Sequence, residues 1–154
     1  MAPRCTIREV RSADIPVLLP MMAAYNRCEA IAFRPRRVER ALRELLRKRA
    51  LGLVLIAQDR ATGSPIGYGV VTYNYDLEFA GPDAFVTELF VDPERRRSGV
   101  AAALLRDFVR RMKRARITAL HLLVLPENRG ARRLYAKLGF AAVPRVMMTR
   151  VLVR

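Results

Sequence analysis

Hydrophobic positions recur with two different periods in the N-terminal part of the chain. Apolar and polar residues alternate over Cys5–Val10, which predicts a first strand. From there the apolar spacing becomes three to four residues, through Ile15, Leu18, Leu19 and Met22. This spacing predicts a helix, with Ser12 as its N-cap, Asp14 in its first turn and its end near Arg27.

The next segment predicts a second helix followed by a hairpin. The helix follows Pro35, carries an apolar stripe of Val38, Leu42, Leu45 and Leu46, and is expected to end at Gly52. Two short runs, Leu53–Gln58 and Ile66–Tyr75, flank a loop of turn-forming residues, which predicts an antiparallel pair. A turn at Gly81–Asp83 then leads into a strand, Ala84–Val91.

The C-terminal half alternates helices with strands. The patterns predict a helix at Ser98–Lys113, a central strand at Thr118–Leu125, a helix at Arg129–Leu138 ending before Gly139, and strands around Phe140–Val143 and Val146–Val153. The whole order is β-α-α-β-β-β-α-β-α-β-β. We therefore expect one mixed α/β domain over residues 1–154.

Composition narrows the class of protein. The chain has 154 residues, 52% of them hydrophobic, and no apolar run reaches the ~18 residues that span a bilayer. No apolar signal core follows the N-terminus, so we expect a cytoplasmic protein with Cys5 and Cys28 as free thiols. The formal charge is +15, carried almost entirely by arginines spread along the chain. An evenly basic, solvated surface is favoured over a dedicated nucleic-acid patch, which stays open.

One segment combines several features of an anion site. Glu88–Leu105 reads as a strand, then Pro93, then a basic loop, then Gly99 at the opening of a helix. Unpaired N–H groups of a first helical turn, the helix dipole and nearby arginines suit a pyrophosphate. The Walker and dinucleotide glycine patterns are both absent. Taken alone, the segment could equally be an ordinary loop with a glycine.

Two motifs resemble those of the GNAT superfamily of N-acetyltransferases. RRSGVA, at Arg96–Ala101, resembles its pyrophosphate motif, and NRGARRLYAKLGF, at Asn128–Phe140, resembles its second motif at every defined position. The two lie in the family's order, with a helix and a strand between them. The resemblance implies the GNAT fold: a mixed, mostly antiparallel sheet of six to seven strands, splayed between the fourth and fifth, with four helices.

The resemblance also implies acetyl-CoA as co-substrate and a set of residues that would bind it. The pantetheine arm would pair with the backbone of Leu89, Phe90 and Val91 and touch Asn128. The pyrophosphate would lie on Arg96, Arg97, Ser98, Gly99, Val100, Ala101 and Ala102. Arg97 stands where relatives often carry glycine, and Ala101 replaces a second glycine.

Direct attack of a neutral amine on the thioester, in a ternary complex, requires a base and an acid. The family's acid corresponds to Tyr135, for which a buried aromatic role is the alternative. Glu88, on the strand beside the cleft, is the candidate base, with a charge on an exposed strand face as the alternative. A backbone N–H of Phe90 or Val91, at a distortion of the fourth strand, would hold the oxyanion.

A second set of residues could contact the acceptor. Asp76 and Glu78 lie between the third and fourth predicted strands, and Tyr73 and Tyr75 could form aromatic walls for a cation. An ordinary solvated loop is the alternative for this cluster. His121 is interpreted as a core or strand residue rather than a catalyst. We expect no metal, because no cluster of metal-ligating residues is evident.

Three functions remain after these observations. The first is acetylation of a small-molecule or peptide amine. A polycation would use Glu88, Asp76 and Glu78, although the net charge would repel it at long range, and acidic amines, neutral amines and N-termini are equally open as acceptors. The second is acetylation of a ribosomal protein or aminoacyl-tRNA, with the positive charge steering binding. The third is a non-catalytic CoA- or RNA-binding module. A homodimer is an expectation from the resemblance.

Overall fold

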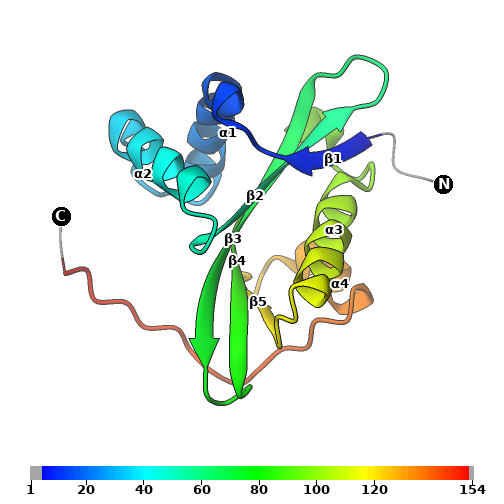
Figure 1. The fold of residues 1–154 in the computed structure, drawn as a ribbon. Coiled ribbons are helices and arrows are strands. Elements are labelled where there is room, and N and C mark those ends of the chain that lie inside the picture. The colour runs from blue at the N-terminus through cyan, green and yellow to red at the C-terminus, as the bar shows by residue number, and fades with distance from the viewer. Residues whose placement is uncertain (1–4, 153–154) are drawn as a thin grey trace. The chain divides into compact units, whose positions relative to one another are not determined.

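The computed structural model describes residues 5–152, which form a five-stranded mixed sheet and four α-helices (Figure 1). The strands lie in the order β1-β2-β3-β4-β5; the first three pairings are antiparallel and β4 pairs with β5 in parallel. The strands are β1 (Cys5–Glu9), β2 (Gly52–Asp59), β3 (Pro65–Asp76), β4 (Gly81–Val91) and β5 (Leu120–Leu122). The helices are α1 (Ile15–Cys28), α2 (Pro35–Arg47), α3 (Val100–Arg114) and α4 (Arg129–Lys137), with 3₁₀ turns at Ser12–Asp14 and Pro93–Arg95. The mixed α/β fold with four helices is as expected.

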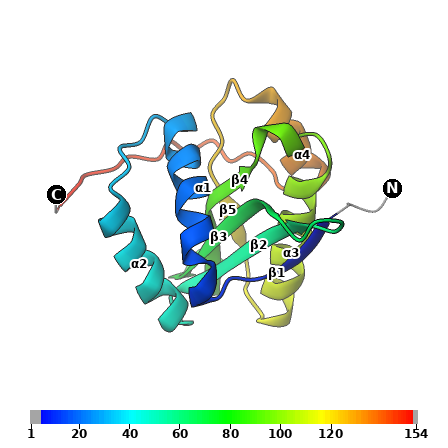
Figure 2. The ribbon, with the colours of Figure 1, turned by 90° about the horizontal axis from the view of Figure 1, so that it is seen from above.

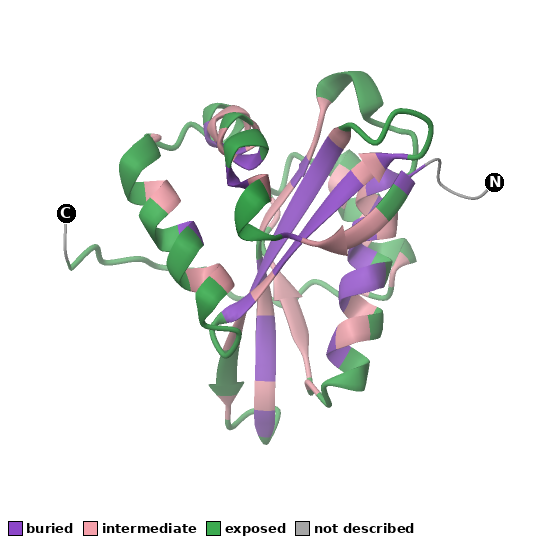
Figure 3. Ribbon diagram, turned by 45° about the horizontal axis from the view of Figure 1, so that its top comes forward, coloured by how far each residue is buried: buried purple, intermediate pink, exposed green. Residues whose placement is uncertain are grey.

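The chain divides into two compact units, one ending at Leu123 and the other beginning at Val124. In the first unit, α1 and α2 cover one face of the sheet and α3 covers the other (Figure 2). The face under α1 and α2 holds the larger core. Its buried members are Val10, Ile15, Leu18, Met22, Leu42, Val54, Ile56, Tyr68, Val70 and Phe90. Buried residues concentrate along β2, along the first half of β3 and on one side of α3 (Figure 3).

The α3 face packs closely because β3 carries a glycine where α3 crosses it. A Cβ on Gly69 would lie 2.6 Å from a ring carbon of Phe108, which is fully buried. The helix can therefore rest directly on the strand backbone.

The first helix begins differently from the prediction. Ser12 does not cap it but lies inside the 3₁₀ turn. The Asp14 carboxylate instead accepts from the Arg11 backbone N–H at 2.7 Å and from the Arg8 guanidinium at 2.7 and 2.8 Å. These bonds, that of Arg8 first, hold the pKa of Asp14 below its usual value. Asp14 is the N-cap residue of α1, but its carboxylate stabilises the preceding turn and makes no capping hydrogen bond to the helix.

Gly52 was also predicted wrongly. The α2 helix ends at Arg47, where the Lys48 N–H makes a last bond to the Glu44 carbonyl, and Gly52 opens β2. A Cβ at position 52 would lie 2.1 Å from the Val71 carbonyl oxygen. The glycine permits close strand pairing rather than helix termination. Likewise Gly81–Asp83, expected as a turn, are the first residues of β4.

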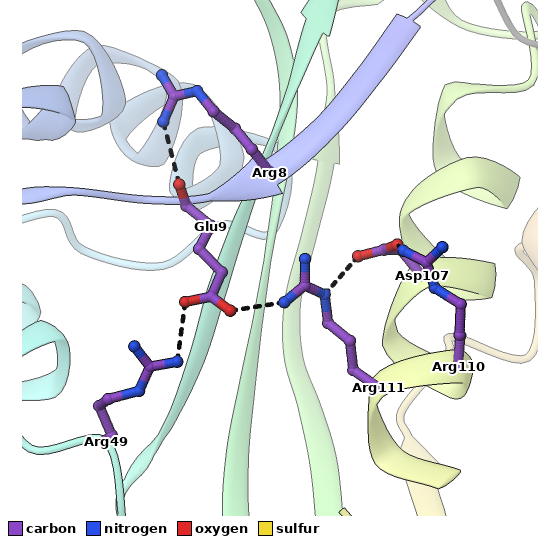
Figure 4. Close-up of polar contacts among 6 residues, drawn as sticks. All are labelled: Arg8, Glu9, Arg49, Asp107, Arg110 and Arg111. Carbon is purple, nitrogen blue, oxygen red and sulfur yellow. Dashed lines mark hydrogen bonds and ion pairs between the residues drawn. The ribbon is translucent and has the colours of Figure 1, made fainter. Parts of the chain in front are cut away.

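A chain of ion pairs joins β1 to α3 on the α3 face (Figure 4). The Arg111 guanidinium donates at 2.6 Å to both Glu9 and the buried Asp107, and Arg49 donates to Glu9 at 3.0 Å. Arg110 also pairs with Asp107. Arg111 therefore links the edge strand to the helix that opens at Gly99.

The second unit contains α4 and no strand among its described residues. Asn128 caps α4 by accepting from the Ala131 N–H at 3.0 Å, and Gly139 follows the helix at φ 89°, as its C′ position requires. The two predicted final strands are absent over residues 140–152, and Val153 lies outside the described residues. A strand needs a partner for its N–H and C=O groups, and residues 140–152 pair with none of the described strands; Pro144 has no N–H to offer. The sheet therefore has five strands rather than six or seven.

Candidate functional site

The outer edge of β4 opens halfway along the strand. Pairing with β5 covers only residues 84–86 of β4. The register with β3 shifts between Val70 and Val71, so that Thr87 is an extra residue on β4. Beyond this bulge, Glu88–Val91 still pair with β3 but have no partner on the β5 side within residues 5–152. The splay between the fourth and fifth strands is thus present, and Leu89, Phe90 and Val91 lie on the open edge.

The distortion of β4 lies earlier than the sequence suggested. It is at Thr87, three residues before Phe90, and the Thr87 carbonyl accepts from the Tyr25 hydroxyl of α1 at 3.3 Å. The bulge accompanies the early end of β5, which has three residues instead of the expected eight. β5 lies at the edge of the described sheet rather than in its centre because residues 140–152 form no further strand. A register shift ends the regular ladder next to Val86 and Leu122.

The loop after β4 is shaped by two left-handed residues. Asp92 caps the Pro93–Arg95 turn by accepting from the Glu94 N–H at 3.1 Å. Arg97 then has φ 59° and Gly99 has φ 86°, and Gly99 is the N-cap of α3. The left-handed conformation favours glycine at position 99, a reason that the sequence alone did not reveal. Because Arg97 has the same conformation, glycine would also suit position 97.

The first turn of α3 presents backbone donors at this loop. The first hydrogen bond of the helix runs from the Ala103 N–H to the Gly99 carbonyl. The N–H groups of Val100, Ala101 and Ala102 therefore have no acceptor within the helix. Residues 96–99 are exposed. Arg96 is oriented by a 3.3 Å bond from its Nε to the Val91 carbonyl, and Ser98 donates to the Arg95 carbonyl. An open loop, a helix N-terminus and two exposed arginines together suit an anion.

Glu88 lies on the face covered by α1 and α2 and has a partner that the sequence analysis missed. The Tyr68 hydroxyl donates to its carboxylate at 2.6 Å. Burial raises the pKa of Glu88, while the bond from Tyr68 acts in the opposite direction. Burial and the nearby Glu88 charge raise the pKa of Tyr68 far above its usual value, so the tyrosine stays a neutral donor. Tyr68 looked like one more apolar strand position, and only the β3–β4 register places it beside Glu88.

The residues around the β3–β4 turn do not form one cluster. Asp76 accepts from the Glu78 N–H at 2.8 Å, which stabilises the turn, and Tyr75 is 66% exposed. Val70 pairs with Glu88 and shares its face of the sheet. Tyr73 is three positions from Val70 on β3, so its side chain points to the opposite face. The charges of Arg49, Glu9 and Arg111 act on Tyr73, as expected on the α3 side, and burial raises its pKa.

His121 does not sit in an apolar core. It lies half-buried on β5, with Nε2 3.1 Å from the carboxylate of the buried Asp83. It is a strand residue, as interpreted from the sequence, but its nearest polar neighbour is an acidic group.

Asn128 and Tyr135 belong to the second unit. The Asn128 side chain caps α4, so only its backbone is free of that role. Tyr135 is half-buried, and its ring packs edge-on against Phe140 with centroids 6.1 Å apart.

Within residues 5–152 no three His, Cys, Asp or Glu side chains form a group that could hold a metal ion. No helix in the same range has the length and apolar character needed to cross a bilayer. Cys5 and Cys28 are not joined in a disulfide; Cys5 is buried and Cys28 exposed. Burial raises the pKa of the Cys5 thiol.

One family profile matches most of the chain. The sequence profile of the Acetyltransferase (GNAT) family matches residues 18–140. No curated protein matches the chain in sequence. Among solved structures, an integron cassette protein from the mobile metagenome of Cole Harbour Salt Marsh superposes with a TM-score of 0.85 at 25% identity, covering 96% of this chain and 91% of that one.

Two further structures carry functional descriptions and share the fold. The aminoglycoside antibiotic 6'-N-acetyltransferase AAC(6')-Ih from Acinetobacter baumannii has a TM-score of 0.78 at 21% identity, covering 97% of this chain and 99% of its own. A ribosomal-protein-alanine N-acetyltransferase from Brucella melitensis biovar Abortus 2308 has a TM-score of 0.72 at 20% identity, covering 96% and 99%.

Proposed function

Because the chain belongs to the GNAT family of acetyltransferases, we propose that it transfers an acetyl group from acetyl-CoA to a primary amine. The observation that carries this proposal is the open edge of β4 followed by the glycine-opened α3. An extended chain can pair with the free backbone of Leu89–Val91, while an anion meets the N–H groups at the start of α3.

The residues present fit acetyl-CoA as judged by their chemistry. The site offers donors and cations where phosphates need them, and a Cβ at Gly99 would meet nothing within 4 Å, so the loop leaves space. Arg96–Ala102 would hold the pyrophosphate, and Leu89, Phe90, Val91 and Asn128 the pantetheine arm. Acetyl-CoA supplies the thioester that the amine attacks.

Glu88 is proposed as the base. Its raised pKa and its position beside the open part of β4 suit a carboxyl that takes a proton from an ammonium group. Tyr68 holds the carboxylate in place through its 2.6 Å bond. A free N–H of Phe90 or Val91 is proposed to stabilise the oxyanion, and Tyr135 to protonate the departing thiolate.

The acceptor is a small-molecule or peptide amine in this proposal. Two of the similar structures are described as acting on an aminoglycoside and on ribosomal-protein alanine, which are both amines. The formal charge of +15 is the specific observation that supports the second of these acceptor classes, a protein bound to RNA.

The test is thiol release from acetyl-CoA across a panel of amines. We expect release that depends on both substrates, and binding of acetyl-CoA that adds about 2.7 kcal/mol of stability at a hundred times Kd. The Tyr135→Phe variant should lower kcat with little change in acetyl-CoA affinity. Absence of acetyl-CoA binding, measured by calorimetry, would remove the enzymatic function altogether.

Tyr68→Phe tests the base. Loss of the bond from Tyr68 lets burial raise the pKa of Glu88 further, so the acidic limb of the kcat/KM profile should move to higher pH. Glu88→Gln should abolish that limb. A limb that stays in place in both variants would assign it to another group.

A further inference from the structure

Acidic residues are segregated in this basic chain. Residues 61–94 contain no lysine, arginine or histidine, but they contain six carboxylates: Asp76, Glu78, Asp83, Glu88, Asp92 and Glu94. This segment therefore carries a formal charge of −6, and the rest of the chain carries +21 to give the total of +15. The segment comprises β3, β4 and the loops beside them. The net charge of the chain thus has the opposite sign to the charge of the segment that contains Glu88.

The carboxylates on the two strands also differ in their partners. Six acidic residues outside the segment form ion pairs with arginine or lysine: Glu9, Asp14, Glu39, Glu44, Asp59 and Asp107. Among the described residues, no arginine or lysine forms an ion pair with Asp76, Asp83 or Glu88. Their negative charges are not neutralised within residues 5–152 by a cationic side chain.

Three of the residues on β4 share one face of the sheet. Asp83, Phe85 and Glu88 pair with Asn74, Thr72 and Val70 of β3, which alternate by two and so point to the same side. His121 is the β5 partner of Phe85 and lies on that face as well. A single surface therefore runs from the candidate base to the Asp83–His121 pair.

Two buried polar atoms of the Asp83–His121 pair, Oδ1 and Nε2, have no hydrogen-bonding partner among the described residues. Asp83 is 3% exposed, and its Oδ1 accepts no hydrogen bond from any described residue. The imidazole Nε2 is at ion-pair distance from Oδ2 but is not aligned to donate. A buried carboxylate left in this state is costly, and a donor with positive charge would relieve the cost.

Aromatic rings flank the same point. The His121 ring packs edge-on against Phe79 at 5.2 Å and is tilted against Phe85 at 5.7 Å. Phenyl faces attract alkylammonium groups, particularly when a carboxylate lies nearby. Because Nε2 is buried and the side chain is 30% exposed, the exposed part of the imidazole lies elsewhere on the ring.

We infer that the acceptor is a chain bearing two or more alkylammonium groups, with one amine at Glu88 and a second held by Asp83, His121 and the two phenyl rings. This inference rests on the proposed acetyltransferase function and names its substrate class. Glu88 and Asp83 are five positions apart on β4, roughly 13–17 Å by strand geometry. An extended polyamine spans that distance, and a basic peptide carries the same groups at comparable spacing.

The experiment compares acceptors that share one reactive amine but differ in further charge. Thiol release from acetyl-CoA is measured with butylamine, 1,4-diaminobutane, spermine and the peptide amide Lys-Lys-Lys. We expect kcat/KM for spermine or the peptide to exceed that for butylamine by tenfold or more, with 1,4-diaminobutane, too short to span the surface, closer to butylamine. The better of the two long acceptors identifies the source of the ammonium groups.

Variants then locate the second ammonium. Asp83→Asn and His121→Asn should each reduce the advantage of spermine over butylamine by roughly tenfold, with the KM for acetyl-CoA unchanged. Glu29→Gln, which removes an exposed carboxylate at the end of α1, is the matched control and should leave the advantage intact. If Asp83→Asn does not fold, Phe79→Leu removes one of the two phenyl rings at the same place and should also reduce the advantage of spermine. Calorimetric binding of spermine to each folded variant gives a readout independent of turnover.

The failure of this inference is separate from that of the proposed function. Thiol release with butylamine at the same efficiency as with spermine would overturn the polycation class and leave the acetyltransferase standing. An equal loss for both acceptors in Asp83→Asn would assign that residue a structural role and overturn its part in binding. No acetyl-CoA binding and no release with any amine would overturn both.

Discussion

The carboxyl group of Glu88 is held where its charge is disfavoured. Burial raises its pKa above the usual 4.5, and the Tyr68 hydroxyl offsets only part of that effect. A carboxyl whose pKa is higher in the folded state favours folding when protonated, and this contribution is lost as the pH rises through the folded-state pKa.

Glu88→Gln should therefore change how stability depends on pH. Glutamine does not titrate, so the wild type should lose stability relative to the variant as the pH rises from below 4.5 to 7. Urea unfolding at several pH values measures the difference in free energy of unfolding. A wild type that gains stability relative to Glu88→Gln over this range would mean that the carboxylate is stabilised in the folded state, contrary to the burial argument.

Gly99 has a left-handed backbone conformation and is proposed to lie at the pyrophosphate site. Gly63 has the same kind of conformation but lies outside that site, so it serves as the control. Both have left-handed φ, at 86° and 72°, and an added Cβ at either meets nothing within 4 Å. Alanine at each position should cost about 1 kcal/mol of stability, measured by urea unfolding. Only Gly99→Ala should also weaken acetyl-CoA binding in calorimetry, by roughly tenfold. An equal affinity in both variants would place the anion away from the start of α3.

At the scale of elements, the placement of α3 depends on charged contacts as well as apolar ones. Arg111 bridges Glu9 of β1 and Asp107, whose side chain is 8% exposed. Removal of the bridging guanidinium leaves Asp107 buried with one fewer donor, and such a loss is expensive.

Arg111→Gln should cost about 1–3 kcal/mol in the free energy of unfolding. Arg43→Gln is the matched control, because Arg43 makes an exposed pair with Glu39 one helical turn away, and this pair should contribute no more than about 0.5 kcal/mol. Chemical denaturation of both variants gives the comparison. Equal, small losses would show that the Glu9–Arg111–Asp107 chain has the energetics of a surface ion pair.

The elements that could be predicted from sequence are those with their own local pattern. The second helix began at Pro35 as expected, and α3, α4 and the β2–β3 hairpin lie close to their predicted positions. Errors arose where pairing decides the structure. Gly52 reads as a helix terminator until its contact with Val71 is known, and the early end of β5 accompanies the bulge at Thr87. The final strands were predicted from apolar residues near the end of the sequence, which do not supply a partner strand.

The candidate site divides in the same way. The loop and the start of α3 could be located because glycine, proline and arginine mark them in the sequence. Tyr68 and the Asp83–His121 pair could not, since each becomes visible only through the register of β3, β4 and β5. Period-two alternation predicts which face of the sheet a side chain occupies. It does not predict which residue of the neighbouring strand lies opposite, because that residue is remote in sequence.

At the scale of the whole molecule, the positive charge and the acidic strands favour different partners. Exposed arginines concentrate at the start of α2, where Arg34, Arg36, Arg37 and Arg40, with Phe33 and Pro35, line an open cavity of ≈ 710 Å³. Such a surface attracts phosphates by sequence-independent electrostatics, and its affinity should fall steeply with salt. A small polycation would be drawn instead to the acidic surface on β4.

Reversing charge on α2 separates these two partners. The Arg36→Glu/Arg37→Glu/Arg40→Glu variant should bind single-stranded RNA more weakly, and its slope of log affinity against log salt should shrink by about 2, at ~0.7 for each phosphate that the protein no longer neutralises. Thiol release with spermine at 150 mM salt should be retained, because the Debye length of about 8 Å screens distant surface charges. If the variant instead lost acetylation of a ribosome-bound protein amine while acetyl-CoA binding was unchanged, the α2 arginines would belong to the acceptor site. An acceptor with phosphate groups, as in a ribonucleoprotein, would then account for the charge of +15 better than a free amine.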